Sequence, residues 1–335
     1  MKNFIFIILS MIISLSACTP GGQKDDSCQD VGIKVIRYDR LQYEATVMNS
    51  FSALQKMNME YPRMTKLMIE DITGVGRVDD DDINDRMCAF FSGDTTLQRL
   101  MVDALEKFND MSGIERQLTN GFCELKEEVQ VPGFPVPKVY SLISALNQSI
   151  VVGDSLLGIS IDKYMGADYP LYKRFYYAHQ RRTMTPERIV PDCFTFYLYS
   201  LYPFRWSAGP RTLYNVLLHR GKINWVVKQL LDEKSDEASL GYTKEEMEWC
   251  KKNGKALWKR MKEQDILSTT DPMVIRAFTH NDPMPLFIGE YDKSMPAAIG
   301  EWLGMKLIDK YMKRHSKLSL GELLDTTDFG TLDLD

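Results

Sequence analysis

The sequence predicts an α+β protein that is mostly α-helical, with a small antiparallel sheet near residues 138–161 packed on a helical domain. Apolar residues recur at helical spacing over long stretches on both sides of that region. Within it, runs rich in β-branched and aromatic residues are separated by turn formers such as Gly153-Asp154. Apolar residues make up 44% and aromatic residues 11% of the 335 positions, which is typical of a well-packed globular protein.

The N-terminus carries a short targeting segment. Lys2 precedes an apolar run from Phe4 to Leu15. This run is shorter than the roughly 20 residues that cross a bilayer as a helix, and it has the length of a signal-peptide core. Leu15-Ser16-Ala17-Cys18 then matches the lipobox of bacterial lipoproteins. We expect a signal peptide at 1–17 and lipid, including palmitate, on Cys18; a plain secretory signal is the alternative.

A flexible tether is predicted at residues 18–32, because this stretch holds proline, glycine and charged residues without apolar periodicity. The three acyl chains of a mature lipoprotein anchor it stably through Cys18. No later segment has 18 consecutive apolar residues. Thr19 is not the aspartate of an inner-membrane retention signal. We therefore expect an outer-membrane protein, on the periplasmic face or the cell surface.

Residues 33–335 are predicted to form a single globular domain. It should begin with a strand at 33–36. Helical spacing of alanine, methionine and leucine follows from 45 to 72, and Pro62 should split this stretch into two helices. Another helix is expected at 95–108. The strands of the sheet are expected at 138–146, 149–152 and 156–161.

Helices should fill the C-terminal half. Thr185-Pro186 gives an N-cap followed by proline, and Pro203 should end that helix. Thr243-x-x-Glu246 is a capping box. A last long helix should follow Pro296. Between Pro203 and the capping box at Thr243, an apolar stripe at helical spacing predicts a long helix. Its residues are Leu213, Val216, Leu217, Arg220, Ile223, Val227 and Leu230.

Charge and cysteine content exclude several classes of protein. The formal charge of −5 becomes −5 − 1 = −6 without Lys2, and such an acidic chain does not favour nucleic acid. The cysteines beyond Cys18 are widely and irregularly spaced, which favours buried free thiols over a disulfide scaffold. They are Cys28, Cys88, Cys123, Cys193 and Cys250.

Metal and cofactor motifs are missing from the sequence. No two of the four histidines lie within four residues of each other, so there is no H-E-x-x-H zinc helix. There is also no G-x-S-x-G elbow and no P-loop. We therefore expect no metal, no cofactor and no catalytic residues.

One block of the sequence is distinctive. Val152-Gly153-Asp154-Ser155 precedes Asp162-Lys163-Tyr164-Met165-Gly166-Ala167-Asp168-Tyr169-Pro170-Leu171-Tyr172. On this block the chain resembles the gliding motility-associated lipoproteins called GldB, over about residues 36–324. Further matches follow in order: Gly221-Lys222, Gly241-Tyr242-Thr243 with Glu246, Trp249, Trp258, Ile299-Gly300-Glu301-Trp302-Leu303-Gly304, and Tyr311-Met312.

The resemblance implies a zincin-like fold, that of peptidases in which one helix carries H-E-x-x-H and a later helix supplies an acidic third ligand. Here the first helix corresponds to residues 192–202, which hold neither histidine nor glutamate. The later acid would stand just before Gly221, where this chain has Arg220. A cation at that position repels a metal ion. The family thus resembles peptidases that have lost zinc.

We expect a non-catalytic lipoprotein that binds other cell-envelope proteins, such as gliding or secretion machinery. The alternatives are a divergent peptidase-like hydrolase and a peptide- or glycan-binding lipoprotein. Arg220 lies on an apolar stripe and needs a carboxylate partner, with Asp192 and Glu301 as candidates for a buried ion pair or a cleft. Aromatic contacts for the last alternative would be Trp206, Trp225, Tyr197 and Tyr199.

Overall fold

The computed structural model describes residues 31–129, 134–205, 209–281 and 295–334. The expected signal peptide, Cys18 and the tether up to residue 30 lie outside the described residues. Val31 falls within the predicted tether but is only 3% exposed, so the folded part already includes it. Within the described ranges, no helix is both long and apolar enough to cross a membrane.

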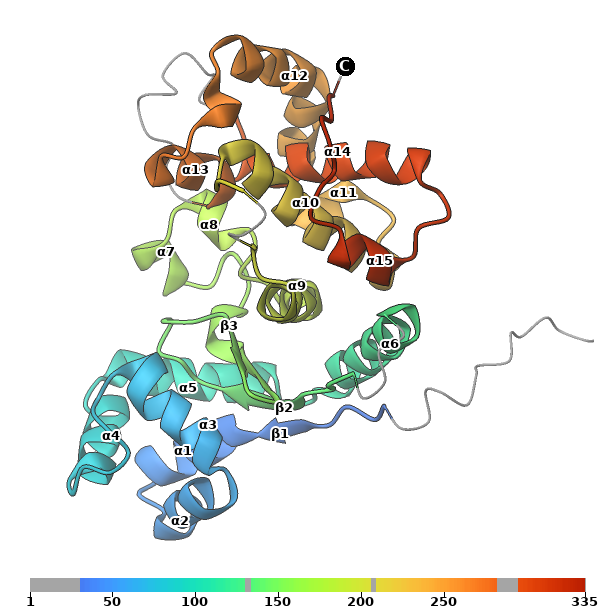
Figure 1. Cartoon of the computed structure of the whole chain (residues 1–335). Helices are drawn as coiled ribbons and strands as arrows, with labels where there is room; N and C mark the ends of the chain where they lie inside the picture. The colour runs from blue at the N-terminus through green and yellow to red at the C-terminus, as the bar shows by residue number, and fades with distance from the viewer. Residues whose placement is uncertain (1–30, 130–133, 206–208, 282–294, 335) are drawn as a thin grey trace, which may run out of the picture.

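A four-stranded sheet lies between two groups of helices (Figure 1). Its strands, in the order β1-β2-β4-β3, are β1 (Val35–Arg37), β2 (Lys138–Leu142), β4 (Leu156–Ser160) and β3 (Ile150–Gly153). The β1–β2 and β2–β4 pairs are parallel, and β3–β4 is antiparallel. The predicted α+β class is confirmed, but the purely antiparallel sheet is wrong. The β3–β4 hairpin places β3 at one edge of the sheet, and the other side of β4 pairs with β2.

The N-terminal helices match the prediction at Pro62 and at 95–108, whereas the helices at 38–46, 83–92 and 112–129 were not expected from the sequence. Helix α2 ends at Glu60 and α3 begins with Pro62 in its first turn, so proline does split the helical stretch. Helix α5 begins after Asp94, whose side chain accepts from Thr96 N. The elements are α1 (Tyr38–Thr46), α2 (Phe51–Glu60), α3 (Pro62–Lys66), a π-helical segment (Leu67–Thr73), α4 (Ile83–Ser92), α5 (Thr95–Lys107) and α6 (Ser112–Val129).

The C-terminal half is helical, as expected. The capping box of Thr243 and Glu246 is present at the start of α12. Thr185 precedes a 3-10 turn, Pro186–Arg188, that leads into α9. The helices are α7 (Tyr172–Phe175), α8 (Ala178–Arg181), α9 (Ile189–Leu201), α10 (Leu213–Leu230), α11 (Asp236–Leu240), α12 (Lys244–Glu263), α13 (Pro272–Thr279), α14 (Ile299–Arg314) and α15 (Leu320–Asp325).

Helix α9 connects the two halves of the fold. It lies between the sheet and α10, while α1 packs on the other side of the sheet (Figure 1). Every residue of β4 is buried, as expected for a strand covered on both faces. Buried apolar residues form one connected core cluster that extends from Val31 to Leu334.

The cysteines differ in state. Cys88, Cys193 and Cys250 are free thiols, as expected. The expectation is wrong for Cys123, which is disulfide-bonded. Disulfides persist in oxidising compartments, so this bond agrees with an exported chain.

Candidate functional site

Helices α10 and α14 cross in direct backbone contact. A Cβ atom at Gly304 would lie 2.0 Å from Leu217 O, and one at Gly221 would lie 2.1 Å from the carbonyl carbon of Gly304. Only glycine allows this approach at both positions. Arg220 directly precedes Gly221, and Glu301 lies one turn before Gly304, so the crossing sets the position of Arg220 against Glu301.

Arg220 pairs with Glu301 at 2.5 Å and also donates to Thr279 O at 3.0 Å. The second carboxylate oxygen of Glu301 accepts from Asn224, one turn further along α10. The side chains of Arg220 and Glu301 are 24% and 13% exposed. Burial disfavours the charged guanidinium, but the Glu301 carboxylate outweighs this effect and raises the pKa of Arg220. Arg220 therefore stays charged, and the pair is largely buried.

Asp192, the other candidate partner, lies elsewhere in the same pocket. It accepts from Arg188 at 2.7 Å and from the Tyr164 hydroxyl at 3.0 Å. Both Arg188 and Asp192 belong to the start of α9, one helical turn apart. Asp192 thus neutralises an arginine of its own turn and forms no ion pair with Arg220.

These residues line a polar cavity of about 270 Å³, which we call the Arg220 pocket. A third arginine, Arg182, pairs in it with Glu246 at 2.7 Å and lies 4.8 Å above the ring of Tyr242. The pocket is bounded by the start of α9, by α10 and α14, and by Ser149 just before β3. Arg182, Arg188 and Arg220 therefore each face a carboxylate of this chain.

The sequence gives only a weak signal for Arg182 and Glu246. Glu246 is recognisable as the third residue of a capping box, and its Oε2 accepts from Thr243 N at 2.9 Å. Its Oε1 accepts from Arg182, which lies far away in the sequence. The several arginines between 181 and 188, close to a helix start, are the one hint that this segment lines a site.

The thiols near the pocket are not activated nucleophiles. Burial raises the pKa of Cys193 well above its usual value, and burial raises the pKa of Cys250 to about 12. A thiol reacts as its thiolate, and a raised pKa disfavours that form at neutral pH. No cluster of three or more histidine, cysteine, aspartate or glutamate residues able to hold a metal ion occurs among the residues the structure describes.

The predicted aromatic contacts do not gather at one site. Tyr199 lines the Arg220 pocket, with the guanidinium of Arg220 5.7 Å from its ring centroid. Tyr197 is 4% exposed and packs edge-on against Phe122. Trp225 lines a shallow cavity on another surface. Trp206 lies outside the described residues.

The distinctive sequence block builds a structural turn. The buried carboxylate of Asp162 accepts from Ser144 N at 3.0 Å and Leu146 N at 2.7 Å. Leu146 and its neighbour Ala145 both have positive φ, at 65° and 54°. The Tyr172 hydroxyl bonds the backbone oxygen of Asp162 and accepts from Met165 N. The block therefore fixes the loop between β2 and β3.

The fold and the pocket define an α+β protein whose central polar cavity is neutralised by internal ion pairs. The chain belongs to the GldB family, since the sequence model described as gliding motility protein GldB matches residues 22–332. This confirms the resemblance drawn from the motifs. No curated protein and no solved structure matches the chain. The zincin-like character of the fold stays a prediction.

Proposed function

We propose that this protein is a non-catalytic outer-membrane lipoprotein that binds other cell-envelope proteins. Its family is that of a gliding motility protein. The observation that carries the proposal is the pairing of all three pocket arginines with carboxylates of the same chain. Acid–base and nucleophilic catalysis need groups that titrate near the working pH, whereas an arginine stays charged throughout that range.

An exposed aromatic residue at the pocket supports protein binding. Phe196 lies on α9, lines the Arg220 pocket and is 44% exposed. Large exposed apolar side chains beside polar groups are typical of binding hot spots. Strand β3 is an edge strand of the sheet and begins directly after Ser149, which lines the pocket. An edge strand offers unpaired backbone groups with which an extended segment of a partner can pair.

Photo-crosslinking followed by rebinding tests the proposal. A photoreactive amino acid at Phe196 should yield a discrete crosslinked envelope protein. The purified partner should then bind the wild-type protein, and Phe196→Glu should weaken that affinity at least tenfold. Phe51→Glu is the matched control, because Phe51 is 76% exposed and lies on α2, away from the pocket. Equal affinity of the two variants would refute a binding site at the pocket.

A peptide-cleavage assay tests the non-catalytic part of the proposal. The purified protein is incubated with a mixed peptide library, and the products are read by mass spectrometry. We expect no products above the level of heat-inactivated protein. Cleavage that disappears in Arg220→Met, with the fold retained, would overturn the proposal in favour of a divergent hydrolase.

A further inference from the structure

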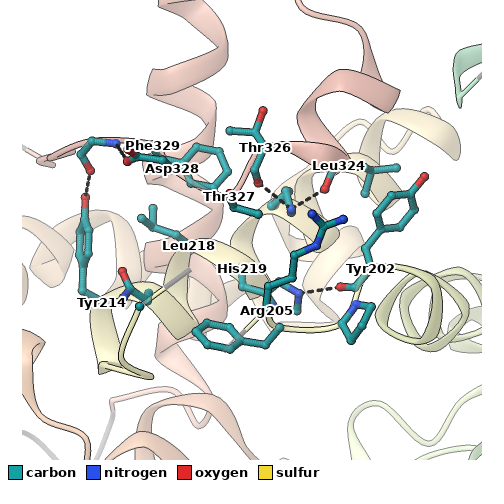
Figure 2. Close-up of a pocket in the computed structure, with 16 residues that line it drawn as sticks. Tyr202, Arg205, Tyr214, Leu218, His219, Leu324, Thr326, Thr327, Asp328 and Phe329 are labelled. Carbon is teal, nitrogen blue, oxygen red and sulfur yellow. Dashed lines mark hydrogen bonds between the residues drawn. The ribbon is translucent and has the colours of Figure 1, made fainter. Parts of the chain in front are cut away.

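A second cavity, of about 400 Å³, lies on the other face of α10 (Figure 2). His219 and Lys222 project to this face, while Arg220 and Asn224 project to the opposite one. The cavity is closed by the segment 202–205 after α9 and by the segment 324–330, which runs from the end of α15. We call it the Lys222 pocket.

Lys222 is a buried ammonium held by backbone oxygens. The residue is 4% exposed, and its Nζ donates to Leu324 O at 2.6 Å and Thr326 O at 2.9 Å. It forms no ion pair with any carboxylate of the described ranges. An ammonium has three donors, so one remains after these two bonds. Burial lowers the pKa of Lys222 to about 8, with Asp325 opposing this effect and Arg205 adding to it.

Arg205 brings a second positive charge to the same end of the pocket. Figure 2 shows its side chain reaching into the cavity toward Leu324 and Thr326, the residues that hold the Lys222 ammonium. The guanidinium of Arg205 has no hydrogen bond or ion pair with other described residues. Two adjacent cations repel each other, and an anion placed between them relieves that repulsion.

Apart from Asp328, the rest of the pocket is neutral or aromatic. The rings of Tyr202, Phe204, Tyr214 and Phe329 line it. His219 Nε2 lies 2.8 Å from Tyr202 O, and burial lowers the pKa of His219 to about 4, so this ring is uncharged.

The acidic residue Asp328 lies at the opposite end from Arg205, where it accepts from Gly330 N at 2.8 Å (Figure 2). The pocket therefore has a basic end and aromatic walls.

We propose that the Lys222 pocket binds a small organic carboxylate, with its carboxylate between Lys222 and Arg205 and a ring or apolar body against the aromatic walls. A planar carboxylate can accept from a guanidinium and an ammonium together, with charge-assisted hydrogen bonds. Two sources share this chemistry: the C-terminal residue of a peptide and an acidic sugar. This site is separate from the proposed protein-binding site, because it lies on the other face of α10.

Calorimetric titration of the lipidated full chain in detergent at pH 6.5 distinguishes the sources. The probes are N-acetyl-phenylalanine, for a peptide terminus, and methyl glucuronide, for an acidic sugar. Each has an uncharged counterpart, N-acetyl-phenylalaninamide and methyl glucoside. We expect one of the two carboxylates to bind at least tenfold more tightly than its counterpart, and the one that binds identifies the source.

Variants of Arg205 show whether binding occurs at this pocket. Arg205 is exposed and unpaired among the described residues, so Arg205→Gln should fold normally and weaken binding at least fivefold. Arg205→Lys keeps the charge and should retain most of the affinity. The control Arg116→Gln removes an equal charge from an exposed site on α6 and should change nothing. Binding of neither carboxylate, or equal affinity of Arg205→Gln and wild type, would overturn the proposal.

Discussion

Asp162 is a carboxylate whose surroundings are entirely protein. It is 0% exposed, and burial raises its pKa even though the backbone N–H groups of Ser144 and Leu146 stabilise the charge. These two donors hold a turn that contains two residues at positive φ. Without an acceptor, the buried N–H of Ser144 and the partly buried N–H of Leu146 would lose their partner. The charge at Asp162 therefore serves the fold of the loop.

Asp162→Ala should lower the free energy of unfolding by about 2–4 kcal/mol, because one buried and one partly buried donor lose their acceptor. Urea denaturation followed by circular dichroism measures this loss. Asp168 belongs to the same block but is 92% exposed, so Asp168→Ala should leave stability unchanged. Equal stability of the two variants would refute a structural role for the block.

Arg220→Met should leave the Glu301 carboxylate with Asn224 as its remaining side-chain donor. Removing one partner of a buried pair costs about 3–5 kcal/mol, and the 24% exposure of Arg220 places the expected loss near the lower end. Urea unfolding of both proteins tests this. The exposed Lys234–Asp232 pair provides the control, since Lys234→Met should have no effect. A loss for Arg220→Met below about 1 kcal/mol, as for an exposed pair, would argue instead for a ligand-binding arginine.

His219 makes stability depend on pH. Burial, helped by the nearby Lys222 and Arg220, lowers its pKa from 6.5 to about 4. Below pH 6.5 the unfolded chain binds a proton at this residue that the folded chain does not bind. Stability should therefore fall as the pH drops from about 6.5 to about 4, by up to about 3 kcal/mol. His219→Gln should lack this pH-dependent loss of stability, so the difference between the unfolding free energies of the two proteins should change between pH 6.5 and 4. If both proteins lose the same stability over that range, His219 is not the residue responsible.

At the scale of elements, the backbones of α10 and α14 approach each other closely where the two helices cross at Gly221 and Gly304. Gly304→Ala would put a methyl group 2.0 Å from Leu217 O, so the helices must separate. We expect a loss of about 2–3 kcal/mol or more, as for overpacked cores. Thermal unfolding measures it. Gly113→Ala on α6, where no atom lies within 4 Å, is the control and should change stability by less than about 1 kcal/mol. A similar small effect at Gly304 would show that the helices adjust freely.

The sequence predicted individual elements better than their pairing. Helical periodicity and caps located α5, α10 and α12, because these signals are local. The order of the strands depends on contacts far apart in sequence, such as Val35 with Val139, and the two-residue period of a strand does not distinguish parallel from antiparallel neighbours.

The same limit applies to the candidate site. A charged residue on an apolar stripe signals a buried ion pair, so Arg220 and its need for a carboxylate could be inferred from spacing. The choice between Asp192 and Glu301 could not, because it is set by the glycine crossing of two helices. The Arg182–Glu246 pair was missed for the same reason, since its partners are brought together only by tertiary packing.

For the whole molecule, the proposed lipoprotein would owe its membrane attachment to the side chain of Cys18. Cys18→Ser removes the thiol that we expect to accept lipid, so the uncleaved precursor should accumulate. Wild-type protein should partition into the detergent phase on phase separation, and it should incorporate radioactive palmitate. The variant should show no label. Wild-type protein that stays in the aqueous phase would disprove lipid anchoring.

The glycine crossing also limits how this sequence can diverge. At most core positions a larger side chain can be accommodated by a smaller neighbour, so the two can drift together over generations. At Gly221 and Gly304 the obstacle to a larger residue is the backbone of the opposite helix, and no neighbouring substitution can shrink a backbone. Descendants of such a protein can exchange the charged residues of a pocket one pair at a time, yet must keep both glycines. A search for distant homologues should therefore give Gly221 and Gly304 more weight than any polar residue of the pocket.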